Sequence, residues 1–270
     1  MIQKFQYYKP TLGHSWLLVA LIIVGSVVAG VLFPHAPHSL GYALMMLLPL
    51  AWCWWQGNNA QLAGGTPLPI NAPHFGQLHP VLFFLLAGIA LLTLGVVIEP
   101  TTNFIPMPDA IKRIFEEAFM DSPLWDAILS TCILAPLLEE FLCRGMMLRG
   151  MLPQKGVRKA ILWSAFLFAF MHLNPWQSIP AFLMGIFLGW VYWRTHCLWA
   201  TIFLHFLNNA MSVVITRLWP DLPVDAGWVD VLPPTIYWIT YAACVVVAAI
   251  SLYILYEKTL PAKVSSPVDA

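Results

Sequence analysis

The segment APLLEEFLCRG, residues 135–145, places two carboxylates and a guanidinium inside a mostly apolar run that extends from Leu124 to Leu148. A carboxylate in such partly desolvated surroundings is suited to act as a general base toward water. A guanidinium four residues away can instead neutralise it. The segment therefore contains candidates both for acid–base chemistry and for a structural ion pair.

Three further polar side chains lie in apolar segments downstream: His172, His205 and Asn209. An ionisable group within a membrane costs roughly 2.5 kcal/mol or more and normally faces a cavity or a partner. We expect these residues and Glu139 to line one polar cavity, because shared water would lower the cost of all of them.

Helical geometry separates the two adjacent carboxylates. Glu140 and Arg144 have the i, i+4 spacing of a same-face ion pair, with the acid on the favourable N-terminal side. Glu139 lies about 100° around the helix and must face a different neighbour. Counted from the charged ends of their segments at about 1.5 Å per residue, Glu139, His172 and His205 lie roughly 15, 20 and 17 Å deep. One layer of a bundle can hold all three.

The composition predicts the elements that position these groups. Hydrophobic residues make up 60% of the chain and charged residues 10%, and the mean hydropathy is +0.75. These values exclude a soluble domain with a polar surface. Windows of about 20 residues predict eight transmembrane helices: 16–33, 40–56, 80–99, 124–148, 159–173, 176–193, 198–216 and 236–256. We predict an all-α polytopic bundle, a single integral membrane domain over residues 1–270, with its polar core at about 124–216.

The basic residues predict the orientation of the bundle, because cytoplasmic segments of membrane proteins collect Lys and Arg. One side of the predicted bundle carries Lys4, Lys9, Arg149, Lys155, Arg158, Lys159, Arg194, Lys258 and Lys263. The other side carries Lys112, Arg113 and Arg217. Both termini are therefore expected in the cytoplasm. On the opposite side, residues 109–121 predict a short amphipathic helix at the interface.

Three motifs lie in order on three of the predicted spans: EEFLCR from Glu139, FAFMH from Phe168 to His172, and HFLNN from His205 to Asn209. Together they resemble the motifs of the CPBP family of intramembrane proteases, which includes CAAX prenyl-protein endopeptidases and bacteriocin-processing or self-immunity proteins. The resemblance covers about 135–210, where Gly185 and Gly189 also have the spacing of a close helix–helix contact.

The resemblance implies hydrolysis of a peptide bond. By motif position, Glu139 would be the general base and His172 would hold and polarise the water. His205 and Asn209 would donate hydrogen bonds to the oxyanion of the tetrahedral intermediate. Glu140 and Arg144 would support the site structurally.

The site residues are compatible with two alternatives, a catalytic zinc ion and no metal. Glu139, His172 and His205 are also a ligand set that catalytic zinc uses, and the family has been described both as metalloproteases and as glutamate-type proteases. Asn209 is a poor zinc ligand and a good oxyanion donor, so we favour a mechanism without a metal.

Two other classes of function also use buried polar groups. One is a catalytically silent scaffold or self-immunity protein of the same fold, and the other is a proton-coupled transporter. For the preferred protease, we expect a protein or peptide substrate, either soluble or anchored in the membrane, and no nucleic-acid partner. The location predicted is a prokaryotic inner membrane, with the chain crossing it several times.

Overall fold

The computed structural model describes residues 2–259, and this part of the chain contains helices and no strand. With 79% of the residues helical, the prediction of an all-α fold is confirmed. The α-helices are α1 (Leu12–Leu32), α2 (His38–Leu62), α3 (Pro80–Ile98), α4 (Asp109–Glu116), α5 (Leu124–Ala127), α6 (Ala135–Glu140), α7 (Arg149–Lys155), α8 (Val157–Phe170), α9 (Pro175–Thr195), α10 (Leu198–Leu218), α11 (Trp228–Val231) and α12 (Pro234–Lys258).

Wider π-helical turns interrupt the helix that carries the two adjacent carboxylates. They extend over Ile128–Leu134 and Phe141–Leu148 and join α5, α6 and α7 into one continuous helix over 124–155, the central helix. A further π-helical turn, Glu117–Asp121, extends α4, and two 3₁₀ helices occur at Ile2–Tyr7 and Glu99–Thr101. The apolar periodicity of the sequence gave no indication of these turns.

The structure places a helix over each of the eight predicted spans. Within residues 2–259, four are long and apolar enough to cross a membrane by length and composition: Leu12–Leu32, Pro80–Thr101, Leu198–Leu218 and Pro234–Lys258. The predicted count of eight spans is therefore not confirmed. The shortest of the eight is α8, whose 14 residues extend only about 21 Å.

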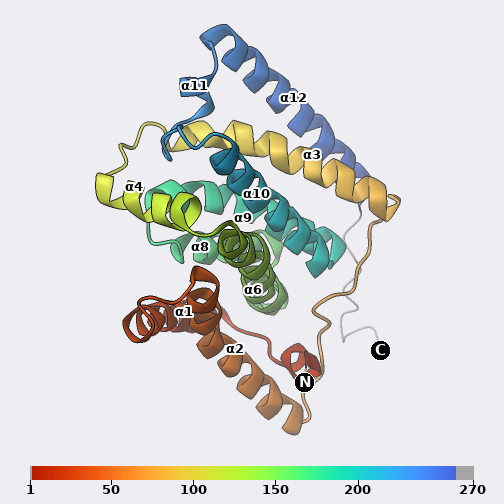
Figure 1. The fold of residues 1–270 in the computed structure, drawn as a ribbon. Helices are drawn as coiled ribbons and strands as arrows, with labels where there is room; N and C mark the ends of the chain where they lie inside the picture. Colours follow the sequence, from red (N-terminus) through yellow and green to blue (C-terminus); the bar gives the residue numbers. More distant parts are fainter. Residues whose placement is uncertain (1, 260–270) are drawn as a thin grey trace.

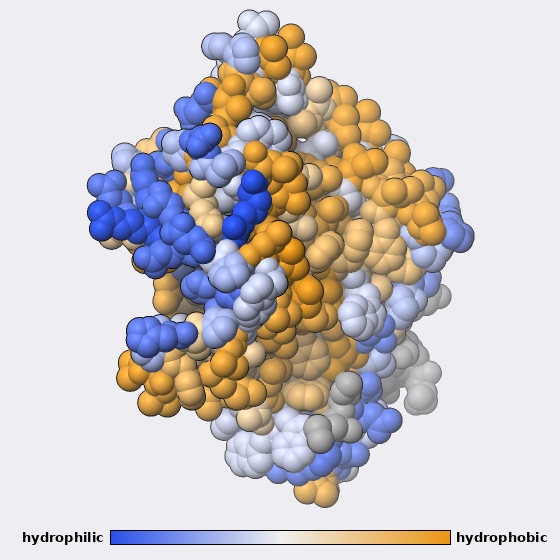
Figure 2. Space-filling model, viewed as in Figure 1, coloured by the Kyte–Doolittle hydropathy of each residue, from blue (hydrophilic) through white to orange (hydrophobic). Residues whose placement is uncertain are grey.

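Three pairs of helices pack closely in the bundle. Helix α1 packs on α2, α8 on α9, and α3 on α12. Figure 1 shows the α1–α2 pair and the α3–α12 pair on opposite sides, with α6, α8, α9 and α10 between them. Figure 2 shows broad hydrophobic surfaces on the outside of this bundle, while hydrophilic side chains gather around α4. Such an apolar exterior is what a lipid environment requires.

Two glycines bring α8 and α9 into close contact, as their spacing predicts. A Cβ added at Gly185 would lie 3.1 Å from the Cα of Ala165, and one at Gly189 would lie 3.2 Å from Cγ2 of Ile161. The absence of side chains at these two positions therefore permits the backbones to approach.

The end of α8 differs from the prediction of a span over 159–173. The helix ends at Phe170, and His172 lies in the turn that leads to α9. Pro175 begins α9 and disfavours helical backbone before it. Leu173 has a φ of 55°, a left-handed conformation that is rare for this residue type. His172 is consequently held by a turn, not by a helix interior.

The end of the bundle that contains residues 145–156 and 194–198 is closed by buried arginines. Arg149, expected at a solvated helix end, is only 3% exposed. Its guanidinium donates to the backbone carbonyls of Phe5, Gln6, Tyr8, Leu68 and Gly145. Arg194, also buried, donates to the carbonyl of Tyr256 and to Oγ1 of Thr259. Among the basic residues assigned to this end, Lys263 lies outside the described residues.

Candidate active site

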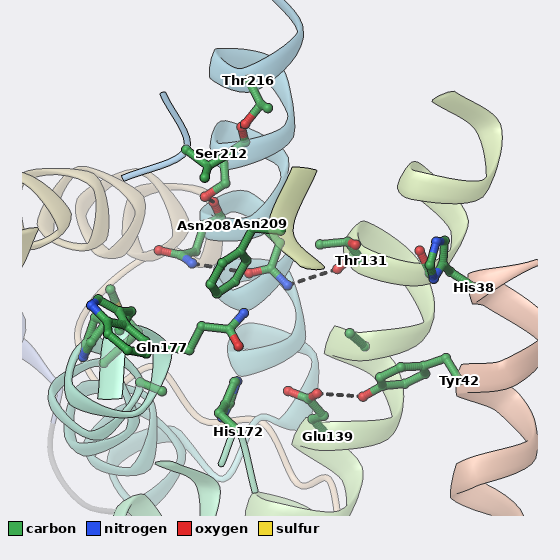
Figure 3. Close-up of a pocket in the computed structure, with 18 of the residues that line it drawn as sticks. His38, Tyr42, Thr131, Glu139, His172, Gln177, Asn208, Asn209, Ser212 and Thr216 are labelled. Carbon is green, nitrogen blue, oxygen red and sulfur yellow. Dashed lines mark hydrogen bonds between the residues drawn. The ribbon is translucent and has the colours of Figure 1, made fainter. Parts of the chain in front are cut away.

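The predicted site residues meet at a cavity in the other half of the bundle. It has a volume of about 980 Å³, and its lining includes Glu139, His172, His205 and Asn209. Three separate elements contribute them: α6, the turn after α8, and α10. Figure 3 shows Glu139, His172 and Asn209 around the cavity, with Glu139 and His172 facing it from different elements.

The ion pair expected between Glu140 and Arg144 is present and fully enclosed. Nη1 of Arg144 lies 2.6 Å from Oε1 of Glu140, and both side chains are 0% exposed. Arg144 also donates from Nη2 to the carbonyl of Gly185 at 3.2 Å. The pair therefore fixes the central helix against α9 and removes one of the two adjacent carboxylates from the cavity.

His205 lies between the two carboxylates. Its Nδ1 is 3.0 Å from Oε1 of Glu140, and its Nε2 is 3.8 Å from Oε2 of Glu139. Because the Glu140 carboxylate accepts hydrogen bonds, Nδ1 carries a proton and Nε2 is directed to the cavity. The ion pair thus also sets the orientation of the histidine ring.

His172 is oriented by a backbone group. Its Nδ1 lies 2.9 Å from the carbonyl oxygen of Phe168, an acceptor, so the proton of the neutral ring is on Nδ1. Nε2 is then an acceptor, suited to a hydrogen bond from water. The ring is part of the cavity lining.

The aromatic residue of the second motif connects the polar groups. Phe168 contacts the rings of His172 and His205 edge-on, with centroid distances of 5.3 and 5.6 Å. The guanidinium of Arg144 lies 4.6 Å from the centroid of the same ring. Phe168 therefore positions both histidines and covers the buried cation with its π face.

Asn209 is held by a carbonyl in a π-helical turn. Its Nδ2 donates to the backbone oxygen of Thr131 at 2.9 Å, and its Oδ1 accepts from Nδ2 of Asn208 at 3.2 Å. An amide nitrogen has two hydrogens, so one remains for another acceptor. His205 and Asn209 lie one helical turn apart on the cavity side of α10, as their spacing predicts.

Tyr42 of α2 is a site residue that the sequence did not indicate. Its hydroxyl donates to Oε1 of Glu139 at 2.5 Å, as Figure 3 shows. This bond occupies one oxygen of the carboxylate and leaves Oε2 on the side of His205. A single tyrosine in an apolar span belongs to no recognisable sequence motif. Only the packing of α2 against the central helix shows that Tyr42 is a site residue.

A second unexpected contact positions Tyr42. Asp126 is 2% exposed, and its two carboxylate oxygens accept from the backbone N–H groups of His38 and Ser39 at 2.8 and 3.0 Å. These groups begin α2, where Pro37 supplies no side-chain cap. Asp126 therefore caps α2 from another helix, which favours a fixed position for Tyr42 one turn further on.

The alternative role of Glu139, His172 and His205 is to bind zinc. Among residues 2–259, no group of three or more His, Cys, Asp or Glu side chains has an arrangement that could hold a metal ion. Glu139, His172 and His205 share the cavity but are not gathered around one point.

The fold and the site together define a class: a polytopic helical membrane protein with a carboxylate, two histidines and an amide around an internal cavity. Residues 121–211 match the family model described as type II CAAX prenyl endopeptidase Rce1-like, and this segment contains all three motifs. The resemblance to CAAX and CPBP intramembrane proteases is thereby confirmed, and the match supports an intramembrane endopeptidase. Comparisons with curated proteins and with solved structures gave no match.

Proposed function

We propose that this protein is an intramembrane endopeptidase in which Glu139 activates the attacking water. The observation that carries the proposal is that two adjacent carboxylates have different environments. Glu140 is neutralised by Arg144 and enclosed, whereas Glu139 lines the cavity beside two histidines. A carboxylate that is kept accessible to water, at a depth where charge is costly, needs a chemical reason.

The attacking water would be held by two acceptors. Glu139 takes its proton as the oxygen attacks the carbonyl carbon of the peptide, and Nε2 of His172 accepts the hydrogen that remains. Tyr42 keeps the Glu139 carboxylate in one orientation through its hydrogen bond. On collapse of the tetrahedral intermediate, Glu139 returns the proton to the leaving amine.

The oxyanion would be stabilised from α10. Asn209 offers a second amide hydrogen, and His205 offers Nε2, which must be protonated in this role. The proposal therefore requires a doubly protonated His205 that lies between the carboxylates of Glu139 and Glu140. No metal ion takes part in this mechanism.

The proposed orientation has both termini in the cytoplasm of a prokaryotic cell, with the chain in the inner membrane. The excess of Lys and Arg on the side of the termini supports it. The substrate is a polypeptide, soluble or anchored in the membrane. The description of the matched family model refers to prenylated substrates, and the proposal does not include prenylation.

The direct test is proteolysis by the purified chain in liposomes, measured with a library of internally quenched peptides. Cleavage by the native sequence and its loss in Glu139→Gln would support the proposal. Glu117→Gln is the matched control, because this glutamate is exposed and lies outside the cavity lining. Full activity of Glu139→Gln would refute the assignment of the base.

A further inference from the structure

The cavity reaches the surface at one end of the bundle. Its lining includes residues from the connections α1–α2, α3–α4, α8–α9 and α10–α11, for example Pro37, Asn103, His172 and Asp225. Among the described residues, the lining includes none from the α2–α3, α7–α8 or α9–α10 connections. Because successive long helices alternate in direction, the four contributing connections lie on the same side. The mouth of the cavity is therefore on that side.

The two sides of the bundle differ in charge. The mouth side carries three basic residues, Lys112, Arg113 and Arg217. The same side carries the acidic residues Glu99, Asp109, Glu116, Glu117, Asp121, Asp221, Asp225 and Asp230. Lys112 forms an ion pair of 2.7 Å with Asp225, and the hydrogen bond to this carboxylate raises the pKa of the lysine. By the distribution of positive charge, the mouth side is extracytoplasmic.

A row of polar side chains leads from the site to the mouth. Asn208, Ser212 and Thr216 follow His205 along the cavity side of α10, and Figure 3 shows them in this order. The hydroxyls of Ser212 and Thr216 donate to carbonyls of their own helix, at 3.3 and 2.8 Å. Their oxygens can still accept hydrogen bonds. From the adjacent helix α9, Gln177 points into the same space.

This row matches the needs of an extended peptide. The twelve residues from His205 to Thr216 extend about 16 Å along the helix, a length that about five residues of extended chain cover. Such a chain exposes backbone N–H and C=O groups that require partners away from water. Hydroxyl oxygens suit the N–H groups, and side-chain amides suit both. A hydrocarbon chain would leave the hydroxyl oxygens and side-chain amides of this row without a substrate partner.

We propose that the substrate is a polypeptide segment that enters from the extracytoplasmic side and lies extended along Asn208, Ser212 and Thr216 with its scissile bond at Glu139. This inference rests on the proposed function and assigns its substrate class and side. It separates this protein from any enzyme that trims protein C-termini on the cytoplasmic face.

Side-specific labelling tests the direction of the mouth. Thr216→Cys is made in the full chain, with the native chain and its five cysteines as background. Lys155→Cys, exposed at the opposite end, is the matched control. A charged, membrane-impermeant maleimide should label the Thr216→Cys variant in right-side-out vesicles and the Lys155→Cys variant only in inverted vesicles.

The opposite pattern would overturn the proposal. Labelling of the Thr216→Cys variant in neither orientation would also overturn it, because the mouth would then be closed to water. Asp225→Cys, at the rim, repeats the experiment if the first variant does not fold.

Cleavage in oriented vesicles tests the substrate. Lysine-flanked, internally quenched octapeptides cannot cross the bilayer, and their charge suits the acidic side. Cleavage should occur in right-side-out vesicles and should be at least tenfold slower in inverted ones. Cleavage only in inverted vesicles would overturn the sidedness and leave the proposed function intact. No cleavage by either preparation or in detergent would refute the proposed function, while the labelling still decides the side of the mouth.

The polar row is tested by kinetics. Ser212→Ala and Thr216→Val should each raise KM about three- to tenfold with little change in kcat, the effect of one lost hydrogen bond in substrate binding. Val214→Ala on the lipid-exposed side of α10 is the control and should leave KM unchanged. Native KM in both row variants would remove the row from the binding site.

Discussion

The two ends of this helix bundle are built in opposite ways. At one end, buried guanidinium groups donate to backbone carbonyls from several segments, and Arg149 alone joins the N-terminal 3₁₀ helix, the α2–α3 connection and the central helix. At the other end, a cavity of about 980 Å³ has a lining that includes Glu139, His172, His205 and Asn209. The comparison indicates that the two ends have different roles: one end stabilises the fold, and the other provides a cavity for water and substrate.

The boundary between the two ends passes between neighbouring residues. Glu140 belongs to the enclosed part and Glu139 to the cavity. Substitutions on the cavity side should therefore change activity without changing stability. Substitutions on the enclosed side should change stability first.

The largest effect is expected for Glu139→Gln. The amide keeps the size of the side chain and can still accept from Tyr42, but it cannot take a proton from water. We expect proteolysis to fall at least about a thousandfold, with unchanged folded yield and thermal stability. Activity is measured with quenched peptides, and stability by thermal unfolding in the same detergent. A large loss of stability would place Glu139 in the enclosed part instead.

Glu140→Gln should destabilise the fold. It leaves the buried guanidinium of Arg144 without its counter-charge, which typically costs about 3–5 kcal/mol of unfolding free energy. Folded yield and activity should fall together, and Arg144→Ala should behave similarly. The double variant Glu140→Gln, Arg144→Met should recover part of the stability, because both charges are absent. A stable but inactive Glu140→Gln variant would exchange the roles of the two glutamates.

Arg149→Met tests the closed end. Methionine retains the apolar stem, but the five carbonyls lose their donor, and we expect about 2–4 kcal/mol lower unfolding free energy. Specific activity per folded molecule should remain close to native, because Arg149 is absent from the cavity lining. Chemical denaturation and active-site titration measure the two quantities. A selective loss of kcat would show that the two ends are not independent.

Tyr42→Phe should have a smaller effect on the cavity side. Loss of the hydrogen bond leaves Glu139 free to rotate, and we expect kcat to fall about tenfold, the effect of roughly 1.4 kcal/mol. Tyr253→Phe, on the exposed side of α12, is the matched control. Unchanged kcat would make Tyr42 a packing residue only.

The smallest effect is expected from chelators. A mechanism with a carboxylate base and an amide at the oxyanion needs no ion, so prolonged treatment with a zinc chelator should leave the rate unchanged. The measurement is peptide cleavage before and after chelation, with metal analysis of the purified protein. Loss of activity that zinc restores would instead assign Glu139, His172 and His205 as ligands.

The sequence predicted the parts that depend on spacing along one helix. The Glu140–Arg144 pair, the shared side of His205 and Asn209, and the close contact at Gly185 and Gly189 all follow from helical periodicity. The match to the family model over residues 121–211 confirms the resemblance to CAAX and CPBP intramembrane proteases. Proteolytic roles remain predictions, as do the orientation and the absence of a metal.

Contacts between distant segments were not predictable in this way. Tyr42 meets Glu139 across 97 positions of the chain, and the carboxylate of Asp126 caps a helix that begins 88 positions earlier. Periodicity describes which residues share a side of one helix, but it contains no information on which helix lies opposite. The burial of Arg149 was missed for the same reason, since its partners are backbone carbonyls of remote segments.

The π-helical turns have a consequence for how this protein tolerates change. Wider turns free backbone carbonyls, and here Thr131 and Cys143 use theirs to accept from Asn209 and from Ser164. Each turn also fixes the rotation of everything that follows it. Deleting one residue from the α-helical segment between the turn Ile128–Leu134 and Glu139 would rotate the downstream helix by about 100° and present Glu140 where Glu139 now stands. The central helix is consequently more sensitive to its length than to most of its side chains, and single-residue deletions there should be more harmful than most substitutions.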